Sequence, residues 1–160
     1  MKLLLDTTYL LPAIGISVKD LNEKAVLNLA DKGHELFISE VSLFELSAKG
    51  AKYVVEGRLS PERVCRGINA IVYDERIKIT RMHETSMLLT AFRLRKIIDD
   101  FIDCIVLSSA INHAEALVTE DEDLHKLSEE ISSLKPGFKI RRLRDFMNTP
   151  PSTSMHNFHC

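Results

Sequence analysis

The chain has 160 residues, 45% of them hydrophobic, and a formal net charge of −2. This length suits one compact domain, and the apolar content excludes an intrinsically disordered protein. The charge balance excludes a uniformly basic nucleic-acid binder, so any such function needs Lys and Arg gathered locally.

The first half of the chain predicts strands that alternate with helices. Residues 2–5 are a short apolar run that indicates a buried strand, and residues 10–14 predict a turn of helix. Apolar residues at helical spacing predict a helix over 20–32. Ser60 and Pro61 form a helix start, with Ser as N-cap and Pro in the first turn. The other elements predicted here are strands over 36–39 and 77–80 and helices over 41–56 and 60–73.

The second half continues the alternation and ends in a polar tail. Residues 100–113 are apolar nearly all round, which predicts a buried helix. The remaining predictions are helices over 83–98 and 121–130 and strands over 117–119 and 138–143. Strands alternating with helices predict a three-layer α/β/α sandwich with a central, mostly parallel sheet. We expect a domain over residues 1–147 and a disordered tail over 148–160, which is rich in Pro, Ser, Thr and Asn.

Acidic residues fall at the ends of the predicted strands. Asp6 ends the first strand, Glu45 lies one turn into the helix after the second, and Asp103 opens the buried helix. Asp121 and Asp123 follow the strand over 117–119. In open parallel sheets ligands bind at the carboxyl ends of the strands, so we expect these carboxylates to converge. Gathered carboxylates repel one another, and Mg²⁺ or Mn²⁺ relieves that repulsion. The absence of an imidazole or thiolate cluster argues against zinc.

Each carboxylate also has a structural explanation when it is considered alone. The alternatives are a turn cap at Asp6, an i,i+4 pair of Glu45 with Lys49, an N-cap pair of Asp100 with Asp103, and a helix start at Asp121 and Asp123. None of these explains all the placements together, whereas a shared metal site does.

Four segments, in this order, carry a resemblance to a known family: LLLDTTYLL, ISEVSLFELS, DDFIDCIVLSSAI and LVTEDEDL. Together they resemble the PIN domain, a family of metal-dependent nucleases that includes the toxins of VapBC toxin–antitoxin pairs. The resemblance runs from residue 2 to about residue 143. It implies a metal-dependent endoribonuclease that hydrolyses RNA phosphodiester bonds with Mg²⁺ or Mn²⁺, and most specifically a VapC-like toxin.

The resemblance also assigns roles to residues. It implies that Asp6, Glu45, Asp103 and Asp121 form the catalytic acidic set, and that Asp6, Asp103, Asp121 and Asp123 bind the metal. Thr7, Thr8 and Thr119 stand where the family often has a hydroxyl or an Asn oriented toward the site. Thr8 departs from the Asn or Ser most common at its position.

An acidic metal site repels phosphates, so RNA binding needs a basic rim. One candidate is the cluster of Arg93, Arg95 and Lys96 near a helix end; a second comprises Lys139, Arg141, Arg142 and Arg144. An ordinary solvated helix face and a charge-protected edge strand explain the two clusters equally well. Aromatic residues make up 6% of the chain and Trp is absent, so no stacking platform is evident.

Partners and location follow from the resemblance and from composition. The resemblance implies RNA, an antitoxin protein and a homodimer, for which apolar residues at 54–55 and 68–72 offer an interface. Two alternatives remain: a PIN-fold RNA-processing nuclease without an antitoxin, and a catalytically inactive RNA- or protein-binding module. A flavodoxin-like phosphoacceptor domain is disfavoured, because such a domain usually has a Lys after a late strand and this chain offers none convincingly after residues 77–80 or 117–119. Three widely spaced cysteines and no signal or membrane segment indicate a cytoplasmic protein with reduced thiols.

Overall fold

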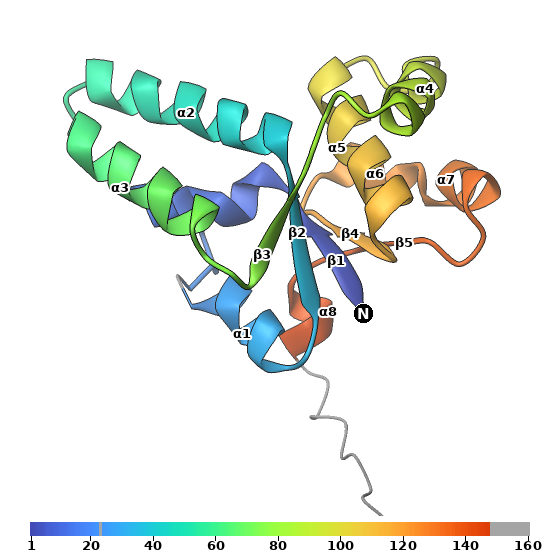
Figure 1. The fold of residues 1–160 in the computed structure, drawn as a ribbon, viewed down its shortest axis with the longest axis horizontal. Coiled ribbons are helices and arrows are strands. Elements are labelled where there is room, and N and C mark those ends of the chain that lie inside the picture. Colours follow the sequence, from blue (N-terminus) through green and yellow to red (C-terminus); the bar gives the residue numbers. More distant parts are fainter. Residues whose placement is uncertain (23, 148–160) are drawn as a thin grey trace, which may run out of the picture.

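The fold is built on a five-stranded sheet. The computed structural model describes residues 1–22 and 24–147. All neighbouring strands pair in parallel, and their order across the sheet is β3-β2-β1-β4-β5 (Figure 1). The strands are β1 (Lys2–Leu5), β2 (Glu35–Ser39), β3 (Ile77–Thr80), β4 (Ala116–Val118) and β5 (Lys139–Arg141). The sheet is thus wholly parallel over the described residues, which confirms the predicted class.

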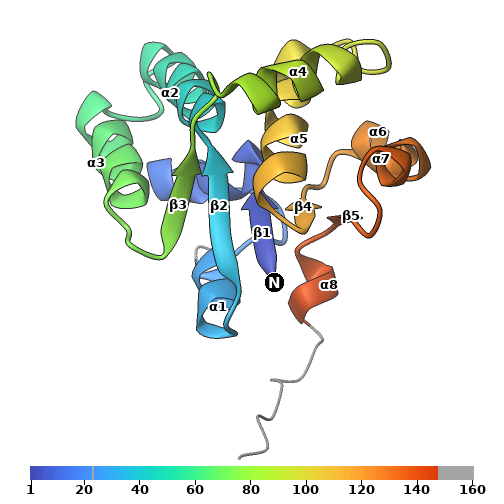
Figure 2. The same cartoon turned by 45° about the vertical axis from the view of Figure 1, so that its right-hand side comes forward.

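Helices connect the strands and cover both faces of the sheet (Figures 1 and 2). They are the 3₁₀ helix η1 (Thr7–Ile14) and the α-helices α1 (Ala25–Asp31), α2 (Glu40–Val55), α3 (Pro61–Val72), α4 (Thr85–Leu94), α5 (Phe101–His113), α6 (Glu122–Lys126), α7 (Ser128–Leu134) and α8 (Arg144–Met147).

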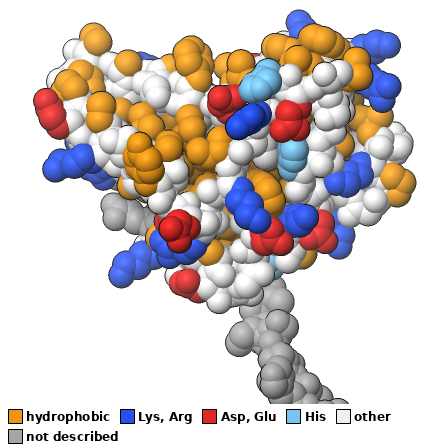
Figure 3. Space-filling view, viewed as in Figure 1, with side chains coloured by type: hydrophobic (Ala, Val, Ile, Leu, Met, Phe, Trp, Pro, Cys, Tyr) orange, Lys and Arg blue, Asp and Glu red, His pale blue; other side chains and the backbone are white. Residues whose placement is uncertain are grey.

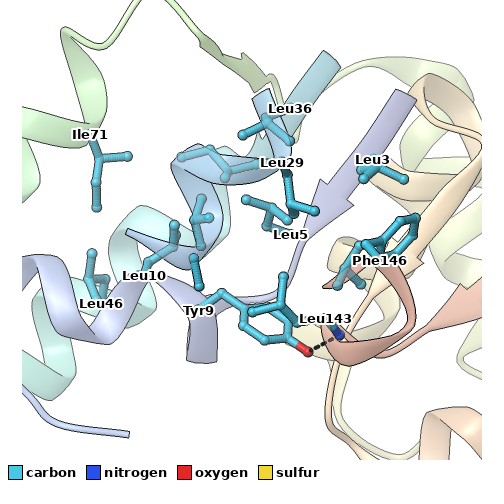
Figure 4. Packing of buried hydrophobic residues seen from close by; sticks show 14 of the residues in the cluster. Leu3, Leu5, Tyr9, Leu10, Leu29, Leu36, Leu46, Ile71, Leu143 and Phe146 are labelled. Atoms are coloured by element: carbon cyan, nitrogen blue, oxygen red, sulfur yellow. Dashed lines mark hydrogen bonds between the residues drawn. The ribbon is translucent and has the colours of Figure 1, made fainter. Parts of the chain in front are cut away.

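The two hydrophobic cores lie on opposite faces of the sheet, because successive side chains of a strand alternate between the faces. Leu3 and Leu5 of β1 join one core, where η1, α1, α3 and α8 pack (Figure 4). Leu4 joins the other core, with side chains from α4, α5, α6 and α7. All three leucines are fully buried. This alternation explains why a short apolar run, rather than an amphipathic pattern, marks the central strand.

The strand order reverses beside β1. From β1 the chain moves outward to β2 and β3, and then crosses back to place β4 on the other side of β1. A reversal of this kind leaves a crevice outside the carboxyl ends of the two adjacent strands. The arrowheads of β1, β2 and β3 point to one common edge of the sheet (Figure 2). The residues that follow β1 and β4 therefore meet at that edge.

Local signals fix several helix ends where they were predicted. The Ser60 side chain accepts a hydrogen bond from the Arg63 N–H and so caps α3. Asp100 caps α5 by accepting from the Ile102 N–H at 2.7 Å. Gly15, at φ 96°, ends η1 in the left-handed region that favours glycine.

The bounds of three predicted helices differ from the structure, and one observed helix was not predicted. The helix predicted over 20–32 begins only at Ala25, and Asp20 before it has a positive φ of 61°. Helix α4 ends at Leu94 because the chain turns there, with the Arg95 guanidinium donating to the Ile98 carbonyl. The helix predicted over 121–130 is divided at Leu127 into α6 and α7. The short α8 was not predicted at all.

Other expectations concern the surface and the tail. Val55 is 89% exposed and Val72 36% exposed, so part of the apolar surface proposed for a homodimer is accessible. Val54 and Ile68 instead pack against the core, and dimerisation there remains a prediction. Within residues 1–22 and 24–147, no helix is long and apolar enough to span a membrane. The predicted disordered tail lies outside the described residues.

Candidate functional site

Asp6 is the innermost carboxylate at the carboxyl edge of the sheet. It follows β1 directly and is the N-cap of η1, with one oxygen accepting from the Thr7 N–H at 2.7 Å. Its second oxygen accepts from the Thr119 hydroxyl at 2.8 Å. Thr119 follows β4, so this hydrogen bond joins the two strands between which the sheet order reverses. Asp6 is thus both a turn cap, as the simple alternative held, and a member of a wider cluster.

Glu45 reaches the same cluster from α2. One of its oxygens accepts from the Thr7 hydroxyl at 3.0 Å, and the other lies 3.3 Å from the Lys49 ammonium. The i,i+4 pair predicted as the alternative is therefore present, but it leaves the Glu45 side chain 26% exposed and linked to Asp6 through Thr7. Thr7 and Thr119 contact the acidic residues as expected. Thr8 makes no side-chain hydrogen bond to them within the described residues.

Asp103 lies in the first turn of α5, and the structure separates its role from that of Asp100. The cap is Asp100, whereas Asp103 makes no capping hydrogen bond within the part of the chain described. Burial raises the pKa of the Asp103 carboxyl to about 6, with further contributions from Asp100, Asp121, Asp6 and Glu45. Contacts connect the four carboxylates predicted from sequence: Thr7 and Thr119 link Asp6 to Glu45 and Asp121, and Asp103 and Asp121 line the same pocket.

Asp121 and Asp123 follow β4, but only Asp121 is hydrogen-bonded to the cluster, through its backbone N–H. The Asp121 side chain caps α6 by accepting from the N–H groups of Asp123 and Leu124, and its own N–H donates to the Thr119 hydroxyl at 3.1 Å. Asp123 has a side chain that is 87% exposed and pairs with Lys126 at 2.7 Å. Asp123 is therefore at the rim, and its predicted metal role has the weakest geometric support.

A pocket of about 370 Å³ opens beside these acids. Five of its nine lining residues are aspartates, namely Asp99, Asp100, Asp103, Asp121 and Asp123. The pKa of the deeper Asp6 is also raised, because burial outweighs the hydrogen bonds from Thr119 and Thr7, and Glu45 and Asp121 add repulsion. The site thus concentrates negative charge, partly shielded from water at Asp6 and Asp103, and a bound cation would relieve the repulsion.

The donor chemistry fits a hard divalent cation. The clustered side chains supply only carboxylate and hydroxyl oxygens, the ligands that Mg²⁺ and Mn²⁺ prefer. In the described residues, however, no group of three or more His, Cys, Asp or Glu side chains is arranged to hold a metal ion. The Asp6 oxygens accept from Thr7 and Thr119, and Asp121 accepts from the start of α6. Metal ligation by these residues therefore remains a prediction.

A second network beside the site was missed from the sequence. The buried Tyr9 hydroxyl donates to Glu120 at 2.7 Å and accepts from the Leu143 N–H at 3.2 Å. The Arg142 guanidinium, 18% exposed, then bridges Glu120 and Glu122. Glu120 lies between Thr119 and Asp121, so the network fixes the turn that carries two site residues. No short-range spacing signals it, since Tyr9 and Glu120 are 111 positions apart.

Tyr9→Phe tests this network. Removing the hydroxyl leaves the buried Leu143 N–H without a partner, so the free energy of unfolding should fall by about 1–2 kcal/mol in urea denaturation. Tyr53→Phe is the matched control, because the Tyr53 ring packs under Arg58 and its hydroxyl makes no hydrogen bond in the described part of the chain. Equal stability of the two variants would show that the Tyr9 hydroxyl contributes nothing.

The same contacts separate the two basic clusters. Arg142 is committed to Glu120 and Glu122, so its charge is already paired. Arg93 and Lys96, at the end of α4, are exposed and have no acidic partner within residues 1–22 and 24–147. Arg95 donates to the Ile98 carbonyl and lies 3.5 Å from Asp99, which lines the acidic pocket. Arg95 thus places the first cluster beside the acidic pocket, and each cluster has one cation that is already paired with an acid.

Comparison with known proteins gives a family match and a similar fold. The PIN domain family model, described as "PIN domain", matches residues 3–130. No curated protein matches the sequence. A solved structure with a similar fold is that of VapBC2 from Rickettsia felis bound to a DNA fragment from its promoter. The similarity has a TM-score of 0.56 at 20% identity and covers 89% of this chain and 98% of the other. At this identity the likeness establishes the fold.

Proposed function

Because the chain belongs to the PIN domain family, whose members are generally nucleases, we propose that it is a metal-dependent endoribonuclease that hydrolyses RNA phosphodiester bonds. The single observation that supports this most directly is the gathering of carboxylates at the carboxyl edge of the sheet, where Thr7 and Thr119 link Asp6 to Glu45 and Asp121, and Asp103 and Asp121 line one pocket. A protein that only binds RNA gains nothing from gathering these charges. The inactive module is therefore the weaker alternative.

In this proposal Asp6, Glu45, Asp103 and Asp121 hold Mg²⁺ or Mn²⁺, with Asp123 as an accessory acid. The ion supplies an activated water and stabilises charge on the phosphoryl oxygens. Thr7 and Thr119 orient Asp6 and Glu45 through their hydroxyls. Lys49 pairs with Glu45, and burial raises the pKa of the Asp103 carboxyl to about 6, so that in the absence of a cation this carboxyl takes up a proton as the pH falls through about 6.

Cleavage of a mixed RNA pool tests the function. Mn²⁺ or Mg²⁺ should support cleavage and raise the melting temperature, because the ion binds the folded acidic cluster and not the unfolded chain. At a hundred times its dissociation constant a ligand stabilises by about 2.7 kcal/mol. EDTA should remove both effects and added Mn²⁺ should restore them. Unchanged cleavage in excess EDTA would refute the proposal.

We also propose that the enzyme is the toxin of a toxin–antitoxin pair. The similar solved structure is a VapBC2 complex, which supports an antitoxin partner. A cavity of about 250 Å³ between η1, α1 and α3 has a mainly apolar lining that also includes Arg63 and Asp74. It could bind an antitoxin peptide that carries both apolar and charged side chains. The alternative is an RNA-processing nuclease of the same fold. A small antitoxin gene directly upstream distinguishes the two.

A further inference from the structure

One carboxylate in the turn after β4 is held from two sides. Glu120 directly precedes Asp121 in this turn. One of its oxygens accepts from the Tyr9 hydroxyl at 2.7 Å, and the other accepts from the Arg142 guanidinium at 3.1 Å. The Tyr9 hydroxyl itself accepts from the Leu143 N–H (Figure 4). The turn is thus fixed both to η1 and to the segment that follows β5.

The contact with Tyr9 differs from an ordinary surface ion pair. Charged pairs are common on the surface, and Figure 3 shows acidic side chains beside Lys or Arg on the face viewed there. Such exposed pairs contribute little to stability. The Tyr9 side chain, in contrast, is only 4% exposed, and a buried hydroxyl takes its hydrogen-bond partners from the protein. The buried ring therefore determines where the Glu120 carboxylate lies.

Tyr9 also connects the segments that carry two of the proposed metal ligands. Its backbone N–H donates to the Asp6 carbonyl at 3.1 Å, in the first turn of η1. Its side chain reaches Glu120, the neighbour of Asp121. A second link is the Thr119 hydroxyl, which donates to the Asp6 side chain and accepts from the Asp121 N–H. Tyr9 thus bridges the backbone at Asp6 and the backbone next to Asp121.

The family match does not reach the far side of this network. It ends at residue 130, so Arg142 and Leu143 lie outside it. Arg142 is 18% exposed and also pairs with Glu122 at 2.7 Å, and the Thr119 N–H donates to the Arg141 carbonyl at 2.9 Å. The segment over 141–143 therefore supports the turn through contacts that the family match does not assign.

The like charges of the two ligands give this support a purpose. Asp6 and Asp121 are both acidic, so without a cation they repel each other, and the repulsion favours a turn that moves Asp121 away. Contacts that oppose this movement hold the ligands in place before the cation binds. Such a preorganised site binds more tightly, because less conformational entropy is lost on binding.

We propose that Tyr9 and Arg142 are positioning residues of the proposed metal site. Acting through Glu120, they keep the backbone that carries Asp121 close to Asp6 when no cation is bound, and so raise the affinity for Mg²⁺ or Mn²⁺. This inference rests on the proposed function, and it adds two residues that act without contacting the ion.

The Mn²⁺ affinity of the metal-free full chain tests the proposal without RNA. Electron paramagnetic resonance measures the free Mn²⁺ during a titration. Tyr9→Phe should raise the dissociation constant roughly tenfold, the lower end of the range for losing a group that orients a metal ligand. Saturating Mn²⁺ should return the cleavage rate of this variant to near that of the wild type, with an unchanged KM for RNA, because the hydroxyl contacts neither the ion nor the RNA.

Two controls separate positioning from a general loss of stability. Tyr53→Phe also removes a tyrosine hydroxyl, but one that makes no hydrogen bond in the described part of the chain. Ile71→Val should lose about as much stability as Tyr9→Phe, since Ile71 is 4% exposed in α3. Figure 4 shows Ile71 apart from Tyr9 in the same core. Both controls should bind Mn²⁺ as the wild type does.

Arg142→Ala separates positioning from charge, because the two effects have opposite signs. Removing a cation beside the acidic site should, by charge alone, strengthen the binding of a divalent cation. Loss of positioning should weaken it, and we expect a dissociation constant several times that of the wild type, in line with loss of an outer contact. Arg144→Ala is the matched control, since Arg144 is exposed and has no acidic partner among the described residues. It should bind Mn²⁺ as tightly as the wild type or slightly more tightly.

A double-mutant cycle tests whether the effect of Tyr9 passes through Glu120. If both act through one contact, adding Tyr9→Phe to Glu120→Ala should weaken Mn²⁺ binding little further. Unchanged affinity of Tyr9→Phe, equal weakening by Ile71→Val, additive losses in the cycle, or tighter binding by Arg142→Ala would each overturn the positioning role while leaving the metal site in place. If the wild type binds no Mn²⁺ and cleaves no RNA, the proposed function fails and the positioning role with it.

Discussion

Asp103→Asn is expected to lower metal-dependent RNA cleavage roughly a hundredfold or more while leaving the fold intact. The magnitude follows because loss of even a residue that orients a metal ligand costs 10–100-fold, and Asp103 is proposed as a ligand itself. The substitution keeps the size of the side chain, and Asp100 continues to cap α5. Cleavage rates at saturating Mn²⁺, measured beside thermal melts, check both parts.

The same variant should be more stable than the wild type without metal. The pKa of Asp103 is about 6 in the folded chain and 3.8 in the reference state, so folding disfavours its charged form. The resulting loss in the free energy of unfolding is absent below about pH 4, grows between pH 4 and 6, and is complete above pH 6. Asn removes it, which should stabilise the metal-free protein at pH 7 by about 1–2 kcal/mol, a value discounted for partial exposure to solvent.

Urea denaturation at pH 4 and pH 7 in EDTA measures this difference. The advantage of Asp103→Asn should vanish at pH 4. Asp31→Asn, an exposed residue of α1 at the other end of the sheet, is the control and should change neither stability nor cleavage. If Asp103→Asn loses stability at pH 7 and keeps its activity, the role of Asp103 is purely structural.

Gly67→Ala should cause the largest loss of stability among these substitutions. Gly67 is buried in α3 where that helix touches η1, and a Cβ there would lie 2.7 Å from the Ile14 Cα and closer still to the Ala13 carbonyl. Backbone atoms cannot rotate away, so α3 or η1 must shift. Overpacking of this kind costs about 1–3 kcal/mol or more, partly offset by the better helix propensity of Ala.

We expect a net loss of about 2–3 kcal/mol in urea denaturation and a melting temperature lowered by roughly 5–10 °C. Gly50→Ala is the matched control on the paired helix α2. Its Cβ would meet side-chain atoms and no backbone, namely the Val64 Cγ atoms at 2.5 and 3.3 Å and the Ile14 Cδ1 at 3.5 Å, so a smaller loss of stability is expected there. Because η1 begins at Thr7, displacement of η1 should also weaken metal binding. Equal costs at the two glycines would show that the close approach of α3 to η1 is not required.

Local sequence signals determined most of the elements and the identity of the acidic residues. The apolar run over 2–5, the Ser60-Pro61 start and the apolar residues of 100–113 are properties of adjacent positions, and they predict β1, α3 and α5 with bounds close to those observed. The parallel sheet followed from the alternation of strands and helices. Asp6, Glu45, Asp103 and Asp121 were selected because each lies at or near the end of an element.

Tertiary structure decided how those residues interact, because the deciding contacts join distant positions. The pKa of Asp103 is raised by burial and then by carboxylates that include those of three other segments, and Thr119 reaches Asp6 across 113 positions. The Tyr9–Glu120 hydrogen bond and the stacking of the Phe92 ring on the Phe101 ring likewise arise only when separate elements pack. Sequence periodicity records which face of an element is buried. It does not record which side chains from different elements meet, and that is what makes this edge of the sheet a candidate site.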